Sequence, residues 1–284
     1  MKAMRVACLM SVLALGLGAC AGAPVEQSGQ PQDPNAFTRE AVQFIERCGS
    51  ERPFFLYLAY NAVHSPLQGD DAYMEKYSGI EDIQRRIFAA MLGQLDDGVG
   101  AVIDAVEKQG ILNNTLIVFF SDNGGPTREL TSSNLPLRGE KGRLFEGGIR
   151  VPFLLQLPSQ IEGGQVYEKP VTSLDLFPTS LALAGIPVEQ QTDGVDLLPF
   201  LTGANANDPH ENLFWRVGPQ GALRKGDWKL VRERKGRQPG PWMLFDLEND
   251  IGETRDLAAE KPEKLRELIQ DWEKYDGEMI DPVF

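Results

Sequence analysis

The feature that most limits the fold of this chain is an apolar run that stops abruptly at a polar turn. Residues 115–120 (TLIVFF) are apolar, β-branched or aromatic, and residues 121–125 (SDNGG) follow directly. Such a run is typical of a strand buried on both faces, as in the parallel sheet of an α/β domain. In open α/β sheets, ligands bind just beyond the carboxyl ends of the strands. The pattern predicts a site at Asp122 and Asn123, although the same residues also fit an ordinary turn.

A second strand is predicted to end in the same way. Residues 53–60 (PFFLYLAY) are followed by residues 61–66 (NAVHSP), which place His64 just past the strand. The oxygens of Asp122 and Asn123 are of the kind that calcium or magnesium prefers. These two strand ends therefore hold the candidate binding residues.

The other predicted elements alternate helices with strands and then become antiparallel. Gly93, Gly98 and Gly100 lie inside the longest helix, where they either permit close packing or are neutral surface residues. Helices are predicted from near Thr38, over 83–106 (ended by Gly110), over 174–185 and over 262–274; strands are predicted over 151–157, 213–217, 221–225, 228–232 and 243–247.

Composition and charge narrow the class of protein. The chain has 284 residues, of which 42% are hydrophobic and 24% charged, as in globular proteins. Its formal net charge is −13, from 28 basic and 41 acidic residues. This balance argues against nucleic acid as the main partner and against a polybasic membrane contact.

The amino-terminal residues resemble an export signal. A cationic start precedes the apolar residues 6–17, and residues 17–20 (LGAC) resemble a bacterial lipobox that would place lipid on Cys20. An ordinary signal peptide with an incidental cysteine is the alternative. We expect export, anchoring by lipid at the periplasmic side of the outer membrane, and no intramolecular disulfide, because Cys48 is then the one cysteine left.

The sequence thus predicts four parts. Residues 1–19 are the signal and residues 20–36 are a lipidated flexible tether. Residues 37–205 form an α/β domain, and residues 206–284 form a small antiparallel sheet plus a helix.

A series of short motifs lies along the chain, at residues 52–58, 64–68, 110–115, 121–125, 137–142, 146–152, 175–179, 193–199, 224–229 and 244–247. Taken in order, these motifs resemble the later part of the formylglycine-dependent sulfatases of the alkaline phosphatase superfamily. The resemblance covers roughly residues 37–257 and implies part of that superfamily's mixed sheet flanked by helices.

The resemblance implies roles for four residues. Asp122 and Asn123 would bind a divalent ion, usually calcium with magnesium possible, while His64 and Lys141 would contact sulfate. The substrate would be a sulfated small molecule or glycan. Taken alone, His64 fits a structural histidine and Lys141 a solvated charge. We expect Glu146 and Arg150 to form a structural ion pair, and Trp215, Trp228 and Trp242 to pack in the small domain's core.

One part of the family pattern is absent. The sulfatase nucleophile arises as formylglycine from Cys/Ser-x-Pro-x-Arg, and these residues do not contain that motif. The nearest run, residues 48–52 (CGSER), has Ser50 in place of the proline. Two hypotheses stay open: sulfate ester hydrolysis to which this chain brings part of the site, or a non-catalytic exported lipoprotein that retains a metal- or sulfate-binding surface. Phosphatase or phosphonate hydrolase chemistry is a third, less favoured by the small-domain motifs.

Overall fold

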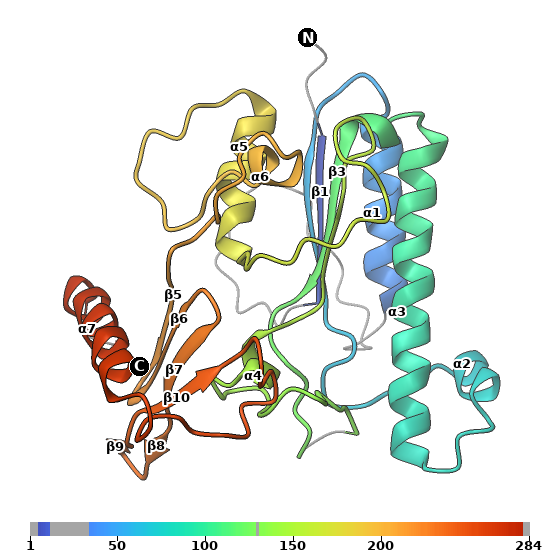
Figure 1. Ribbon diagram of the computed structural model, residues 1–284. Coiled ribbons are helices and arrows are strands. Elements are labelled where there is room, and N and C mark those ends of the chain that lie inside the picture. The colour runs from blue at the N-terminus through green and yellow to red at the C-terminus, as the bar shows by residue number, and fades with distance from the viewer. Residues whose placement is uncertain (1–4, 12–33, 129–130, 281–284) are drawn as a thin grey trace. The chain divides into compact units, whose positions relative to one another are not determined.

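The computed structural model describes residues 5–11, 34–128 and 131–280, and these divide into two compact units (Figure 1). The first unit is Met1–Asp122 with Pro152–Asn207, and the second is Asn123–Val151 with Asp208–Phe284. The division places residues 123–151 with the C-terminal part, whereas the sequence predicted one continuous domain over residues 37–205. Leu144 and Phe145 of this segment pack in one buried cluster with side chains of the C-terminal sheet, and long-range ion pairs described below join the same parts of the chain.

The first unit contains a four-stranded mixed sheet in the order β2-β1-β3-β4. Strands β2 and β3 both run parallel to β1, and β4 is antiparallel to β3. The elements of this unit are β1 (Arg5–Ser11), α1 (Pro34–Cys48), β2 (Phe55–Tyr60), α2 (Asp71–Lys76), α3 (Ile83–Lys108), η1 (Leu112–Asn114), β3 (Thr115–Ser121), β4 (Phe153–Gln156), η2 (Ser173–Asp175), α5 (Leu176–Ala184) and α6 (Leu198–Leu201).

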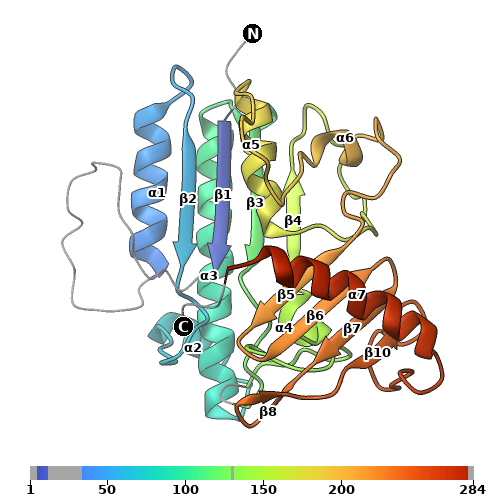
Figure 2. The ribbon, with the colours of Figure 1, turned by 90° about the vertical axis from the view of Figure 1, so that its left-hand side faces the viewer.

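Helices cover both faces of this sheet. Helices α1 and α3 pack together on one face, where Ile45 and Val102 contact a core that includes Tyr60 of β2 (Figure 2). Helix α5 lies on the other face, where Leu116 and Phe120 of β3 are buried. Alternate residues of β3 therefore face opposite helix layers, which explains why its sequence is apolar without break.

The placement of β1 differs from the sequence prediction. Residues 5–11 were assigned to an export signal that stands apart from the fold, but here they pair with both β2 and β3. A short apolar run suits a signal core and a buried strand equally, so composition alone did not distinguish them. The export signal stays a prediction.

The helices otherwise follow the sequence patterns, with shifted ends. Helix α1 begins at Pro34, inside the predicted tether, because proline suits the first turn of a helix. Helix α3 begins after Asp82, whose Oδ1 accepts a hydrogen bond from the Arg85 backbone N–H at 2.7 Å. Pro178 falls in the first turn of α5, the one place where the helix tolerates it.

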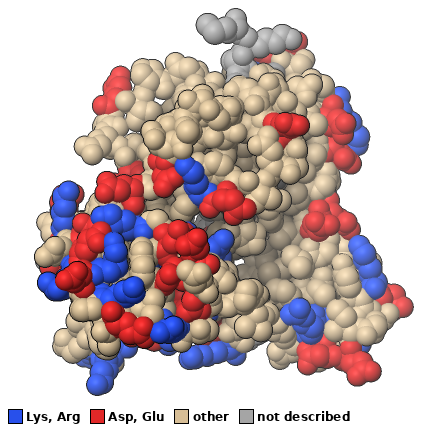
Figure 3. Space-filling model, in the orientation of Figure 1, with Lys and Arg blue, Asp and Glu red and all other residues tan. Residues whose placement is uncertain are grey.

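The second unit is a four-stranded antiparallel sheet, in the order β10-β7-β6-β5, packed on one long helix. The predicted strands and helix are confirmed, and Trp215, Trp228 and Trp242 pack at its core as expected. Acidic and basic side chains are intermingled around α7 (Figure 3). The elements are α4 (Glu146–Ile149), β5 (Leu213–Val217), β6 (Gln220–Lys225), β7 (Trp228–Arg232), β8 (Arg234–Lys235), β9 (Gln238–Pro239), β10 (Met243–Asp246) and α7 (Pro262–Glu278).

Candidate active site

Two of the predicted site residues lie at the same edge of the first unit's sheet. Tyr60 of β2 and Ser121 of β3 are both in register with Ser11 of β1. Because neighbouring strands are about 4.8 Å apart, the ends of β2 and β3 are separated by roughly 10 Å. His64 follows β2 and Asp122 follows β3, so the parallel sheet brings their two loops to one edge.

The ring of His64 is oriented by its own turn. Its backbone N–H donates to the Asn61 carbonyl at 2.9 Å, and its Nδ1 lies 2.7 Å from the Ser65 carbonyl oxygen. A carbonyl oxygen only accepts, so Nδ1 carries a proton. The other nitrogen, Nε2, is then an acceptor in the neutral ring and becomes a donor only in the imidazolium.

In the second unit, glycines allow the backbone of the turn after Asn123 to pack directly against the backbone of α4. The Gly124 N–H donates to the Gly148 carbonyl at 3.0 Å. A Cβ at Gly124 would lie 1.8 Å from the Gly147 carbonyl oxygen, and one at Gly148 would lie 2.1 Å from the Arg143 carbonyl oxygen. Only glycine fits at these positions, so the predicted turn and the start of α4 are packed together in this unit.

Asn134 fixes the loop between these motifs, and sequence reasoning missed it. Its Oδ1 accepts from the Gly125 N–H at 3.0 Å, and its Nδ2 donates to the carbonyls of Gly125 at 2.8 Å and Gly139 at 3.1 Å. One amide thus ties the turn after Asn123 to the approach to Lys141. A lone asparagine in a polar loop gives no pattern from which this role is evident.

Lys141 sits between well-anchored neighbours. Gly139 and Gly142 have φ of 88° and 82°, values that favour glycine. Glu140 accepts from the Thr127 hydroxyl at 2.8 Å and from the Arg128 N–H at 3.0 Å. The Thr127 hydrogen bond is the main reason that the pKa of Glu140 lies below its ordinary value. The loop therefore presents a half-buried Lys141 on a defined backbone.

Glu146, Lys229 and Glu253 form a buried network of charged side chains in the second unit. The expected pair is confirmed, since Arg150 Nη1 lies 3.7 Å from Glu146 Oε2, but Lys229 makes the closer contact, with its Nζ 2.8 Å from Glu146 Oε1. The same Nζ lies 3.0 Å from Glu253 Oε1, and Arg224 Nη1 is 3.6 Å from Glu146 Oε2. These contacts tie Glu146 to side chains of the C-terminal part, together with the apolar packing of Leu144 and Phe145 in the same unit. No local pattern predicts partners so distant along the chain.

The predicted site residues are thus divided between the units. His64 and Asp122 belong to the first unit, and Asn123 and Lys141 belong to the second. Their convergence on one pocket stays a prediction. Cys20 lies outside the described residues. Cys48, at the end of α1, is half-buried and not in a disulfide.

Asp122 and Asn123, in the turn after β3, fit part of a metal site. Asp122 and Asn123 have the right oxygen chemistry, but calcium takes about six to eight oxygen ligands, more than two side chains provide. Within the described ranges, no group of three or more His, Cys, Asp or Glu side chains is placed to hold a metal. The part of the chain that the structure describes also contains no helix long and apolar enough to cross a membrane.

Comparison with known proteins agrees with the motifs. The family model described as Sulfatase matches residues 19–186, and that of the C-terminal part of N-sulphoglucosamine sulphohydrolase matches residues 140–275. Arylsulfatase J of Mus musculus is 32% identical in an alignment of 282 residues with gaps counted, and the match covers 82% of this chain and 47% of that protein. Arylsulfatase A of Homo sapiens is 33% identical in an alignment of 266 residues with gaps counted, and the match covers 83% of this chain and 50% of that protein.

Solved structures show the same likeness. The crystal structure of Ps i-CgsB is 37% identical with a TM-score of 0.78, and the match covers 85% of this chain and 54% of that one. A phosphonate monoester hydrolase from Silicibacter pomeroyi, at 19% identity and a TM-score of 0.67, shares the fold alone. The chain spans about half the length of the curated relatives it matches, and the match lies in their C-terminal part. Since the Sulfatase model covers more than half of its 284 residues, the chain belongs to the sulfatase family, within the alkaline phosphatase superfamily.

Proposed function

We propose that this chain is the C-terminal part of a sulfate ester hydrolase and supplies side chains that bind sulfate and a divalent metal. The observation that carries the proposal is the arrival of the His64 and Asp122 loops at one edge of a parallel sheet, within a family of sulfuric ester hydrolases. Sulfate ester cleavage places negative charge on the sulfuryl oxygens and on the leaving oxygen, and donors or cations stabilise that charge.

Each predicted residue has a defined task. Lys141 donates to sulfuryl oxygens as a point charge. His64, with Nδ1 held by Ser65, donates from Nε2 in its imidazolium form to a sulfuryl or leaving oxygen. Asp122 and Asn123 would hold the divalent ion, for which we propose calcium. When bound, that ion would stabilise developing negative charge on the sulfate group.

The covalent step needs a nucleophile that these 284 residues do not encode in the family's form, because Cys/Ser-x-Pro-x-Arg is absent. The formylglycine would therefore come from another segment. We expect the isolated chain to hydrolyse aryl sulfates no faster than buffer does.

For the substrate, we propose a sulfated carbohydrate. The relative Ps i-CgsB, 37% identical, has been solved in complex with k-i-k-neocarrahexaose. Export and lipid attachment at Cys20 remain part of the proposal. Incorporation of labelled palmitate into the expressed chain, and its loss in Cys20→Ala, would test them.

A chimera tests the catalytic proposal. Residues 37–284 replace the matching part of Ps i-CgsB, so that its own N-terminal part stays covalently attached. We expect sulfate release from an aryl sulfate, lowered about 100-fold or more by His64→Ala, Lys141→Ala or Asp122→Ala. Lys108→Ala and Asp104→Ala, at exposed positions of α3, are the matched controls. A folded chimera without turnover, or one that ignores the site substitutions, would contradict the proposal.

The absent nucleophile motif favours a second candidate, a non-catalytic protein that retains the metal-binding surface. Titration of the isolated chain with calcium chloride in a calorimeter separates the two. Calcium binding that Asp122→Ala weakens, together with an inactive chimera, would support this second candidate.

A further inference from the structure

The β8–β9 hairpin of the second unit is a basic surface in an acidic chain (Figure 1). Residues 232–240 (RERKGRQPG) contain four basic side chains and one acidic side chain, whereas the whole chain has a net charge of −13. Arg234, Lys235 and Arg237, called the hairpin cations below, are all exposed. Basic side chains reach the surface at this end of the unit (Figure 3). The hairpin is therefore a local positive field that attracts anionic ligands.

The hairpin cations are not neutralised in the way that other cations of this unit are. Lys225 pairs with Asp271 at 2.8 Å, for example. In the part of the chain that the structure describes, no carboxylate is paired with a hairpin cation. The acidic side chain of the hairpin, Glu233, pairs with Arg143 instead. The positive charge of the hairpin therefore faces solvent and is open to a ligand.

The backbone of the hairpin is well defined. The ladder between β8 and β9 leaves residues 236 and 237 as a two-residue turn. Gly236 has a φ of 65°, which such turns require and which glycine adopts without strain. At the base of the hairpin, the guanidinium carbon of Arg232 lies 4.4 Å from the ring centroids of both Trp242 and Trp272. The hairpin cations are thus held together on a fixed backbone, so little main-chain entropy is lost when an anion binds.

The hairpin is joined to the loop that carries Lys141. Arg143 Nη1 lies 2.7 Å from Glu233 Oε1. Lys141 is two residues before Arg143, and Arg234 directly follows Glu233. Two residues of chain span at most about 7 Å. The candidate sulfate contact and the first hairpin cation therefore lie on either side of a single ion pair, where one ligand with several anionic groups can reach both.

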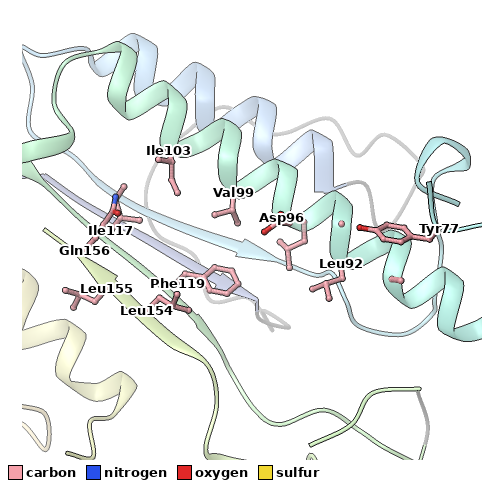
Figure 4. A pocket seen from close by; sticks show the side chains of 13 residues that line it. Tyr77, Leu92, Asp96, Val99, Ile103, Ile117, Phe119, Leu154, Leu155 and Gln156 are labelled. Carbon is pink, nitrogen blue, oxygen red and sulfur yellow. The ribbon is translucent and has the colours of Figure 1, made fainter. Parts of the chain in front are cut away.

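The apolar groove of the first unit has the opposite character. It has a volume of about 730 Å³ and lies between α3 and the strands β3 and β4 (Figure 4). Asp96 is the one acidic or basic residue among those that line it. A carboxylate repels an anion, and the groove offers few polar groups to orient a ligand. An anionic carbohydrate is therefore expected at the hairpin and not in this groove.

Sulfate is an anion that the hairpin cations suit. Two of the three are arginines, whose planar guanidinium pairs with oxyanions through two parallel hydrogen bonds. A molecule with one sulfate would engage Lys141 and leave the hairpin unused. We infer that the β8–β9 hairpin is a second sulfate-binding subsite and that the substrate is a carbohydrate chain with several sulfates. The inference rests on the proposed function for the sulfate that is cleaved, but its readout is binding, not turnover.

The test measures binding of the full chain to dextran sulfate, a polysulfated polysaccharide, by biolayer interferometry at low ionic strength. We expect binding that added salt weakens, because exposed charges are screened, and no binding to unsulfated dextran. A triple variant should raise the Kd about tenfold or more; it combines Arg234→Gln, Lys235→Gln and Arg237→Gln. The matched control removes the same charge from exposed positions at or in α7, and combines Lys261→Gln, Arg266→Gln and Lys274→Gln.

The outcomes separate a built subsite from a general effect of charge. Circular dichroism of each variant shows whether it is folded, and Lys235→Glu, a single charge reversal that should also weaken binding, is an independent second variant. No binding, or equal weakening by the hairpin and control triples, overturns the inference. So does polyglutamate that binds as tightly as dextran sulfate, which would assign the hairpin to an acidic polypeptide.

The same measurements keep this inference apart from the catalytic proposal. Hairpin-dependent binding together with an inactive chimera would leave the subsite standing and reject the catalytic proposal. An active chimera, together with a chain that shows no hairpin-dependent binding, would do the reverse.

Discussion

Lys229 is the residue whose environment most constrains the second unit. It is fully buried, and its ammonium group faces the carboxylates of both Glu146 and Glu253. Glu253 also adopts a φ of 51°, and its Oε2 accepts from the Glu146 backbone N–H at 2.7 Å. Burial raises the pKa of Glu253, and Lys229 opposes that shift. The ammonium group of Lys229 therefore offsets the energetic cost of burying two carboxylates.

The substitution Lys229→Met removes that ammonium and leaves the carboxylates buried without their main partner. We expect the free energy of unfolding of the second unit to fall by about 3–5 kcal/mol, measured by urea denaturation at neutral pH. Lys225→Met is the matched control, because Lys225 is partly exposed and pairs with Asp271 at the surface. The free energy of unfolding of Lys225→Met should fall by no more than about 1 kcal/mol. Equal losses in the two variants would contradict the role given to Lys229.

The pH dependence of that loss has a definite sign. In Lys229→Met the pKa of Glu253 rises further in the folded state, while its value in the unfolded chain is ordinary. A raised carboxyl pKa gives a contribution that is present below the unfolded value and is lost as pH rises through the folded one. The destabilisation should therefore grow from acid to neutral pH. Denaturation series at pH 5 and pH 7 would check the direction.

The contribution of Glu140 to folding stability depends on pH with the opposite sign. The Thr127 hydroxyl, with help from the Arg128 backbone and side chain, lowers the pKa of Glu140. Its contribution is present above the unfolded pKa and is lost as pH falls through the lower folded value. Thr127→Val should raise the pKa of Glu140 toward the ordinary value, as NMR titration of its carboxyl carbon would show. An unchanged pKa would mean that the Thr127 hydrogen bond does not form.

At the scale of elements, the three glycines inside α3 have different surroundings. A Cβ at Gly98 would lie 2.6 Å from Thr38 Oγ1, which is itself 2.9 Å from the hydroxyl of Tyr60. A Cβ at Gly93 would meet the ring of Tyr77, whereas one at Gly100 would meet nothing within 4 Å. Close packing therefore explains Gly93 and Gly98, and Gly100 is the neutral surface residue that the sequence left as the alternative.

Two alanine substitutions on the same helix should act in opposite directions. Gly98→Ala should destabilise the first unit by about 1–3 kcal/mol, because the methyl group displaces the buried Thr38 and Tyr60 pair. Gly100→Ala should stabilise it by about 0.5–1 kcal/mol through lower backbone entropy in the unfolded chain. Thermal melts of both variants provide the comparison. A stabilising Gly98→Ala would show that α1 and α3 are not packed as closely as described.

At the scale of the whole molecule, the strand β1 links the fold to the expected fate of the amino terminus. It pairs along its length with β2 on one side and β3 on the other. If residues 1–19 are removed on export, β2 and β3 each lose a row of backbone hydrogen-bond partners. An unpaired strand in that position is costly and favours pairing with another chain. A chain that keeps residues 1–19 and one that loses them on export are therefore expected to differ in the stability of this sheet.

Deletion of residues 1–19 tests this consequence. We expect the first unit to melt at a temperature lower by about 10 °C or more, and the amides of β2 and β3 to lose protection from hydrogen exchange. Deletion of residues 1–4 leaves β1 intact and is the control. Unchanged protection in the longer deletion would mean that β1 does not stabilise the sheet in solution.

The sequence by itself determined the local elements and the order of the motifs. The unbroken apolar run of β3, the spacing of α3 and the turns between β5, β6, β7 and β10 each report the burial of residues within one element. These patterns were enough to place His64 and Asp122 after two strands and to indicate the family from its motifs.

Only the tertiary structure decided which distant segments meet. It placed residues 5–11 between β2 and β3, joined residues 123–151 to the C-terminal sheet, and paired Lys229 with Glu146 and Glu253. It also showed that Asn134 holds together the loop before Lys141. The physical reason is that periodicity records that a side chain is buried, whereas the identity of the group that buries it depends on contacts between residues far apart in the chain.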